Sequence, residues 1–278
     1  MARPNLSYLK NVVLTLTGIP LGVITGITGA ASSALSIPFL GFLIGLRGPR
    51  AVSTALTVNA VAAFASLLAY SQHGYIAWPA ALLLVVCQII GTAQAQKLRG
   101  QRKPAPIWTS AFVAVALGLV MAFVGVSKHI TIHGVDDLLN PPGPVPHLRL
   151  VDYALIGVIG WAVGAIGLVL DLGGLLVVPA LVFGMHFAPH WAQGLALVSL
   201  ALTGVPVVAA HASSGMLEGR SAFWLSCGAL FGGLVGAMYA TMRFNGGLLL
   251  VVSGGLLCVV AMVRYVRSEP PVVVEKSS

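Results

Sequence analysis

The stretch GITGAASSALSIPFL, Gly26 to Leu40, and its later counterpart GLVLDLGGLLVVPAL, Gly167 to Leu181, decide the fold. Both stretches lie within hydrophobic sequence, yet they contain glycine, proline and polar residues. Glycine and proline determine the shape of the backbone more than its hydrophobicity. The two stretches therefore predict breaks in otherwise helical segments.

The composition is that of a membrane protein. Of the 278 residues, 58% are hydrophobic and 8% are charged, and the mean hydropathy is +0.96. Soluble domains contain about 25% charged residues, so this chain has too few to cover a soluble surface. No cleavage site follows the first apolar segment, which we therefore expect to be retained as a membrane segment rather than removed as a signal peptide.

The net charge of +8 comes from basic residues that lie between and after the apolar runs. This placement favours membrane topology over nucleic-acid binding as its explanation. The three cysteines, Cys87, Cys227 and Cys258, lie within apolar runs without a CxxC spacing. They indicate neither a disulfide framework nor a metal site. We expect no cofactor, no bound metal and no nucleic-acid partner.

A membrane helix needs about 20 mostly apolar residues. The candidate segments are, in chain order, 9–28, 33–46, 51–71, 76–96, 106–127, 151–170, 174–185, 191–212, 221–241 and 247–266. Segments 33–46 and 174–185 are short, and each follows a full-length segment after a glycine-rich break. They contain Pro38 and Pro179, respectively. We interpret each short segment as part of a broken or re-entrant helix pair.

The chain divides into two halves at a polar, proline-rich stretch. Aligned with itself at an offset of 141 residues, the chain matches at equivalent segment boundaries, which indicates an internal repeat. The matched glycines and prolines are Gly26 with Gly167, Pro38 with Pro179, Gly74 with Gly215, and Gly91 with Gly232. The predicted organisation is a first membrane repeat over 1–127, an extracytoplasmic linker over 128–150, a second membrane repeat over 151–267 and a cytoplasmic tail over 268–278.

The distribution of charge predicts the orientation. If each broken pair crossed the membrane once, the cluster Lys97 to Lys103 would lie opposite an N-terminus that carries Arg3 and Lys10, against the positive-inside rule. If each pair returns to the side it entered, these basic residues all face the cytoplasm and Asp136 faces outward. The second arrangement predicts an all-α polytopic membrane protein. It has two inverted repeats, each with a broken or re-entrant helix pair followed by three transmembrane helices.

This order of features resembles the sulfite exporter TauE/SafE family, also called the toluene sulfonate uptake permease family, of bacterial membrane carriers. The resemblance covers roughly 18–100 and 157–242. It rests on GITGAASSALSIPFL, AVSTALTVN and the element Tyr70, Gly74, Ile76 in the first half, and on GLVLDLGGLLVVPALVFG and AQGLALVSL in the second. Where family members carry a glycine triplet ahead of the proline, this chain has Ala31, Ser32 and Ser33 in the first half and only Gly173 and Gly174 in the second.

The resemblance implies secondary transport of a small sulfur-containing or organic anion, such as sulfite or a sulfonate, by a multi-pass protein of the bacterial cytoplasmic (inner) membrane. The departure from the glycine triplet bears on the substrate more than on the fold. The residues alone imply a carrier or a channel, and they leave an anion channel or a non-transport accessory membrane subunit as alternatives. No enzyme motif stands in a suitable context.

The breaks also predict an anion site. Helices that begin near Ser33 and Gly174 would direct unpaired amides and the positive end of the helix dipole toward one place. The predicted substrate-binding residues are Thr28, Ser32, Ser33, Asn59, Gln88, Gly173 and Gly174. Gln88 is compatible with a pore-lining position or with an interhelical hydrogen bond. The alternative for the glycines and serines is that they serve close helix packing only.

Asp171 precedes the second break directly. A carboxylate within a membrane segment is costly and commonly functional, and burial raises its pKa, so we expect Asp171 to couple proton movement to transport. Alternatively, Asp171 caps the following helix or lies in the headgroup layer. The expected partners are a small anionic substrate and the lipid bilayer, and a homo-oligomer is left open.

Overall fold

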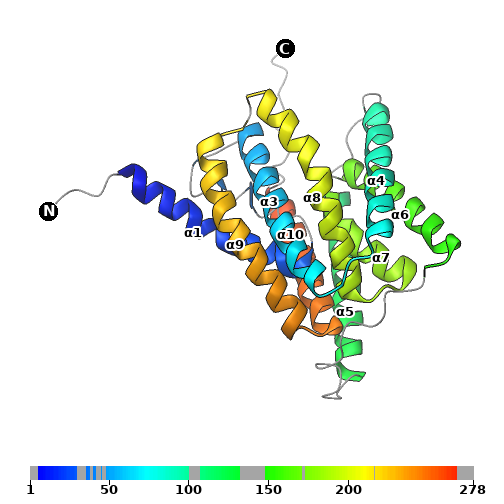
Figure 1. Cartoon of the computed structure of the whole chain (residues 1–278). Helices are drawn as coiled ribbons and strands as arrows, with labels where there is room; N and C mark the ends of the chain where they lie inside the picture. The colour runs from blue at the N-terminus through cyan, green and yellow to red at the C-terminus, as the bar shows by residue number, and fades with distance from the viewer. Residues whose placement is uncertain are drawn as a thin grey trace, which may run out of the picture.

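The computed structural model describes residues 6–29, 36–37, 40–41, 45, 48–99, 107–131, 148–170, 173–215 and 217–267. Within these residues every regular element is helical (Figure 1). The elements are α1 (Leu6–Thr28), α3 (Pro49–Gln72), α4 (Trp78–Arg99), α5 (Ile107–Thr131), α6 (Leu150–Leu170), the 3-10 helix η2 (Gly173–Leu176), α7 (Val177–Met185), α8 (Pro189–Ser213), α9 (Gly219–Arg243) and α10 (Gly246–Arg267).

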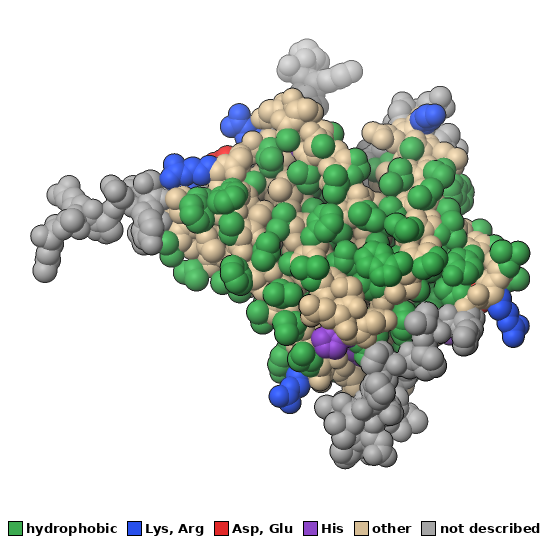
Figure 2. Space-filling view, viewed as in Figure 1, with side chains coloured by type: hydrophobic (Ala, Val, Ile, Leu, Met, Phe, Trp, Pro, Cys, Tyr) green, Lys and Arg blue, Asp and Glu red, His purple; other side chains and the backbone are tan. Residues whose placement is uncertain are grey.

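Eight of these helices, α1, α3 to α6 and α8 to α10, are long and apolar enough to cross a membrane. Large apolar side chains lie on the outside of the bundle, as in Phe112, Phe123 and Phe231, whose exposed fractions are 71%, 74% and 65%. Figure 2 shows hydrophobic side chains over most of the visible face, with Lys and Arg near its edges. Such a surface suits lipid rather than water. The chain is a multi-pass, all-α membrane protein, as predicted.

The predicted long segments agree with the helices to within a few residues at each end. Most of segment 33–46 lies outside the described residues. Segment 174–185 is confirmed as a short apolar helix, but its first turn is the tighter 3-10 helix η2 and α7 begins at Val177. Starting there places Pro179 in the first turn of α7, where its missing N–H is not needed for a helical hydrogen bond.

Glycines set the distance between the helices. On α1, Gly18, Gly22 and Gly26 recur every fourth residue and lie against the backbone of α9, and on α9 Gly228 and Gly232 lie against the backbone of α1. A Cβ atom built on Gly232 would lie 2.0 Å from the carbonyl oxygen of Ile19. These helices therefore pack backbone against backbone, which is a common way for membrane helices to associate.

The two halves of the chain are interlocked by such contacts. Helix α1 packs against α9, and α4 packs against α6, so that each pair joins the first half to the second. A Cβ atom on Gly91 of α4 would lie 2.1 Å from the carbonyl oxygen of Trp161 on α6. Gly91 and Gly232, which the 141-residue offset matches, thus make the same kind of contact in two different helix pairs.

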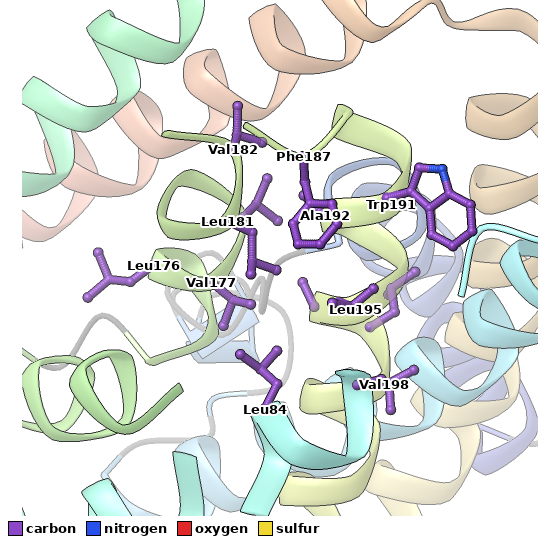
Figure 3. Packing of buried hydrophobic residues seen from close by; sticks show 14 of the residues in the cluster. Leu84, Leu176, Val177, Leu181, Val182, Phe187, Trp191, Ala192, Leu195 and Val198 are labelled. Atoms are coloured by element: carbon purple, nitrogen blue, oxygen red, sulfur yellow. The ribbon is translucent and has the colours of Figure 1, made fainter. Parts of the chain in front are cut away.

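Helix α8 lies at the centre of the main hydrophobic cluster. Its residues from Trp191 to Ser199 are all buried, and α3, α4, α7, α10 and η2 all pack against the helix. Figure 3 shows Leu181 and Val182 of α7 and Leu84 of α4 near Trp191, Leu195 and Val198 of α8. This part of α8, from Trp191 to Ser199, therefore places its side chains in the protein interior.

Candidate functional site

The buried half of α8 carries two polar side chains that are almost wholly enclosed. Gln193 is 0% exposed and Ser199 is 1% exposed. A polar group at membrane depth is costly unless it finds a hydrogen-bond partner or reaches a wet cavity. The partners of these two residues therefore identify where the interior is polar.

Gln193 joins three helices. The Tyr70 hydroxyl of α3 donates a hydrogen bond of 2.5 Å to Oε1 of Gln193, and Nε2 of Gln193 donates one of 3.2 Å to the Ser253 hydroxyl of α10. Tyr70 is 0% exposed and Ser253 is 5% exposed. Gln193 and Ser253 were not predicted as site residues from the sequence. The signal that could have found Gln193 is the one that singled out Gln88, an amide within an apolar segment.

The first break begins directly against Gln193. Gly29 closes the last turn of α1 by donating from its N–H to the carbonyl oxygen of Thr25, at 2.9 Å. Its φ of +62° lies in the left-handed region that glycine adopts without a steric penalty. A Cβ atom at Gly29 would lie 3.1 Å from Cβ of Gln193. The backbone that leaves α1 therefore touches the residue that joins α3, α8 and α10.

Of the predicted residues near the first break, Thr28 is 2% exposed and its hydroxyl donates a hydrogen bond of 2.7 Å to the carbonyl oxygen of Ile24. Asn59 is 1% exposed, on α3, and α3 packs against α1. The structure thus buries Thr28 and Asn59 on neighbouring helices. Ser32 and Ser33 lie outside the described residues.

The second break also borders α8. Gly173 and Gly174 form the start of η2, which packs against α6, α7 and α8. Asp171, the predicted proton-coupling residue, lies outside the described residues. The described ends of both breaks therefore meet the same central helix.

Gln88 makes an interhelical hydrogen bond, which was one of its two predicted roles. The Ser199 hydroxyl of α8 donates to Oε1 of Gln88, and the Thr92 hydroxyl donates to the backbone carbonyl oxygens of Gln88 and Gly164, at 2.8 and 3.3 Å. Within the described part of the chain, Nε2 of Gln88 has no hydrogen-bond partner. Gln88, which is 8% exposed, therefore keeps two N–H donors for another group.

An aromatic cluster covers the N-terminal end of α8, next to Gln193. Tyr75, in the turn between α3 and α4, stacks on His190 with ring centroids 5.0 Å apart and meets Trp191 edge-on at 6.1 Å. A Cβ atom on Gly194 would lie 2.2 Å from the carbonyl oxygen of Tyr75. The turn thus packs directly on the backbone of α8, and the Tyr75 ring contacts the rings of His190 and Trp191.

The polar interior is uncharged where the structure describes it. Among the described residues, every buried polar side chain is a Thr, Ser, Asn, Gln or Tyr. The same residues contain no group of three or more His, Cys, Asp or Glu side chains that could hold a metal ion. Hydroxyl and amide groups can donate hydrogen bonds to an anion without a buried cation. The chemistry available here is recognition through neutral donors.

The comparisons with known proteins agree with this architecture. The sequence profile of the family described as "Sulfite exporter TauE/SafE" matches residues 2–127. A "Probable membrane transporter protein" of Xylella fastidiosa strain 9a5c is 25% identical over 273 residues, which cover 93% of this chain and 95% of that protein. Another protein with this name, from strain Temecula1 / ATCC 700964, is 25% identical over 241 residues, covering 84% and 86%. No solved structure matches the chain.

These matches confirm the resemblance that the two breaks indicated. The family profile covers the first membrane half, and the transporter relatives extend over both halves. Together with the eight apolar helices, they support a membrane transporter. The first half of the chain, residues 2–127, is thus similar to the sulfite exporter TauE/SafE family.

Proposed function

We propose that the protein is a secondary transporter that moves a small sulfur-containing or organic anion, such as sulfite or a sulfonate, across the bacterial cytoplasmic membrane. The observation that carries the proposal is the contact between the first break, at Gly29, and Cβ and the backbone of Gln193, whose side-chain amide is buried. This contact brings irregular backbone to a polar, uncharged interior. Irregular backbone at membrane depth is tolerated where it is buried or lines a cavity, and neutral donors suit an anion. The family match supports a sulfur-containing substrate.

The transport proposal is tested in proteoliposomes. We expect saturable uptake or efflux of at least one of sulfite, thiosulfate and an organic sulfonate, because a carrier binds its substrate during each cycle. Protein-free liposomes are the control for leakage. If no such anion moves, the proposed function is wrong. If flux rises linearly with concentration without saturation, the protein is a channel.

Proton coupling is a second part of the proposal and rests on Asp171, a carboxylate between apolar segments. In wild-type proteoliposomes we expect a pH gradient to drive anion accumulation. With Asp171→Asn, we expect the anion to move down its own gradient while the pH gradient loses its effect, because an amide cannot carry the proton. The measurement is uptake with and without the gradient. Unchanged proton dependence in the variant would contradict the role of Asp171 alone.

We also propose that the two halves are inverted repeats. In Figure 1 the end of α4 and the start of α9 lie toward the top, whereas the end of α9 and the start of α10 lie toward the bottom. Lys97, near the end of α4, and Arg220, near the start of α9, therefore belong to one end of the helix bundle, and Arg243, at the end of α9, belongs to the opposite end. The positive-inside rule favours the cytoplasm for the face with Lys97 and Arg220, because more Lys and Arg of the sequence fall at that face. Helices α4 and α9, which the offset matches, would cross the membrane in opposite directions.

This orientation predicts the labelling of single cysteines. In a variant in which Cys87, Cys227 and Cys258 are replaced by alanine, we expect Arg243→Cys to react with a membrane-impermeant maleimide in intact cells. Lys97→Cys should react only after permeabilisation. Both positions are exposed, so access depends on the side of the membrane. Reaction of both cysteines in intact cells would contradict the inverted repeats.

A further inference from the structure

The hydrogen bonds around Gln193 leave donors unused. The Tyr70 hydroxyl, the Gln193 amide and the Ser253 hydroxyl carry four polar hydrogens between them: one, two and one, respectively. Two hydrogen bonds join the three groups, and these groups make no other hydrogen bond within the described part of the chain. Two hydrogens therefore remain. This number is the same whichever way the amide is turned, so it does not depend on the assignment of its oxygen and nitrogen.

These unused donors are fully enclosed. Gln193 and Tyr70 are each 0% exposed, and Ser253 is 5% exposed. A buried donor without an acceptor is costly, so the site is incomplete as an isolated network. A water molecule would accept these hydrogens but would bring two of its own, which need further acceptors. An anion accepts hydrogen bonds and brings no hydrogens, so it suits a site that has an excess of donors.

The position of the network also points to the transported ion. Gly29, where the first break begins, lies against Cβ and the backbone of Gln193, so the residue that carries an unused donor adjoins the break. The network also joins α3 of the first half to α8 and α10 of the second. An anion held here would lie next to groups from both halves of the protein, as expected for a carrier in which the halves move relative to each other.

We propose that Gln193 is a substrate-contact residue, and that the side chains of Gln193 and Ser253 donate hydrogen bonds to the transported anion. The inference rests on the proposed function and adds to it a specific recognition site that the sequence analysis did not contain. The site distinguishes substrates by their hydrogen-bond acceptors. Oxyanions such as sulfite or methanesulfonate fit it, whereas an organic cation or a hydrogen-bond donor does not.

The decisive variant is Gln193→Glu, which keeps the shape of the side chain. The carboxylate carries no hydrogen and accepts from the hydroxyls of both Tyr70 and Ser253, so the network keeps no unused donor, and its charge repels an anion. Gln193→Met, which conserves volume, removes the amide and serves if the charged variant does not fold. Ser66→Ala is the control, because it removes a buried α3 hydroxyl outside this network, which bonds to the carbonyl oxygens of Ala62 and Gly233.

The purified full-length protein is titrated with sodium sulfite and with sodium methanesulfonate at constant ionic strength. Its melting temperature is recorded, and the half-saturating concentration is measured in proteoliposomes. We expect Gln193→Glu to weaken binding by about a hundredfold or more and Gln193→Met by about tenfold or more, because each lost hydrogen bond to an ion reduces affinity by about tenfold to a hundredfold. Ser66→Ala should retain the wild-type affinity.

The outcomes separate this inference from the proposed function. If the wild-type protein neither binds nor transports any of these anions, the proposed function is wrong and the role of Gln193 falls with it. If the wild-type protein transports an anion and the folded Gln193→Glu or Gln193→Met protein has the same half-saturating concentration, only the role of Gln193 is wrong. A folded Ser66→Ala protein that loses affinity as fully as Gln193→Glu would also overturn the inference, because loss of a hydroxyl outside the network would then have the same effect as loss of the donors.

Discussion

Gly232→Ala and Gly91→Ala are each expected to prevent the protein from accumulating in folded form, whereas Gly255→Ala is expected to have almost no effect. A Cβ atom on Gly232 or Gly91 would lie 2.0 or 2.1 Å from a backbone carbonyl oxygen of the facing helix. Backbone cannot rotate away as a side chain can, so the whole helix must move. Overpacking commonly costs about 1–3 kcal/mol, and a contact this short against backbone belongs at or above the upper end of that range.

The control lies on α10, where two neighbouring glycines differ in their surroundings. A Cβ atom on Gly254 would lie 2.4 Å from the carbonyl oxygen of Gly118, while nothing lies within 4 Å of one on Gly255. Gly254→Ala should therefore behave like Gly232→Ala. The measurement is the yield of monodisperse protein in detergent and its melting temperature. Wild-type melting temperatures for Gly254→Ala and Gly232→Ala would contradict backbone-to-backbone packing at these positions.

Much of this packing could be expected from the sequence. The membrane segments were predictable because hydropathy acts over some 20 residues and tolerates errors at the ends. The match of Gly91 with Gly232 was visible as well, because glycines required for close helix contact recur in both halves. The partners of these glycines were not predictable. Nothing in the sequence indicates that Gly91 meets Trp161, since that contact depends on which helices are neighbours.

The candidate site was predictable only in part, for the same reason. Thr28 and Gln88 were noticeable as polar residues in or beside apolar sequence, and both are buried. The Tyr70–Gln193 and Gln193–Ser253 hydrogen bonds join residues 123 and 60 positions apart. No periodicity extends over such distances, so these bonds depend on how α3, α8 and α10 pack. The 3-10 turn at Gly173 also depends on its packing against α6 and α8.

Gly29→Ala is expected to reduce anion transport by about a hundredfold, a loss of the size seen when a binding group is displaced by about 1 Å. By contrast, Gly215→Ala is expected to leave transport per folded molecule unchanged. Gly29 and Gly215 have φ values of +62° and +70°, so alanine brings a similar left-handed strain of about 1–2 kcal/mol at each position. The two positions differ in their surroundings. A Cβ atom at Gly29 would lie 3.1 Å from Cβ of Gln193, whereas at Gly215 nothing lies within 4 Å.

The new methyl group at position 29 must displace either the backbone that leaves α1 or the stem of Gln193. Both responses disturb the contact between the first break and Gln193. Gly215→Ala is the control for the left-handed backbone strain, which both variants share. The measurement is the initial rate of sulfite uptake in proteoliposomes, corrected for the amount of folded protein, with melting temperatures recorded for both variants. Equal melting temperatures with a lower rate for Gly29→Ala alone would locate the defect in transport rather than in folding. Equal rates would mean that transport does not depend on the contact between Gly29 and Gln193, and the break would then serve helix packing alone.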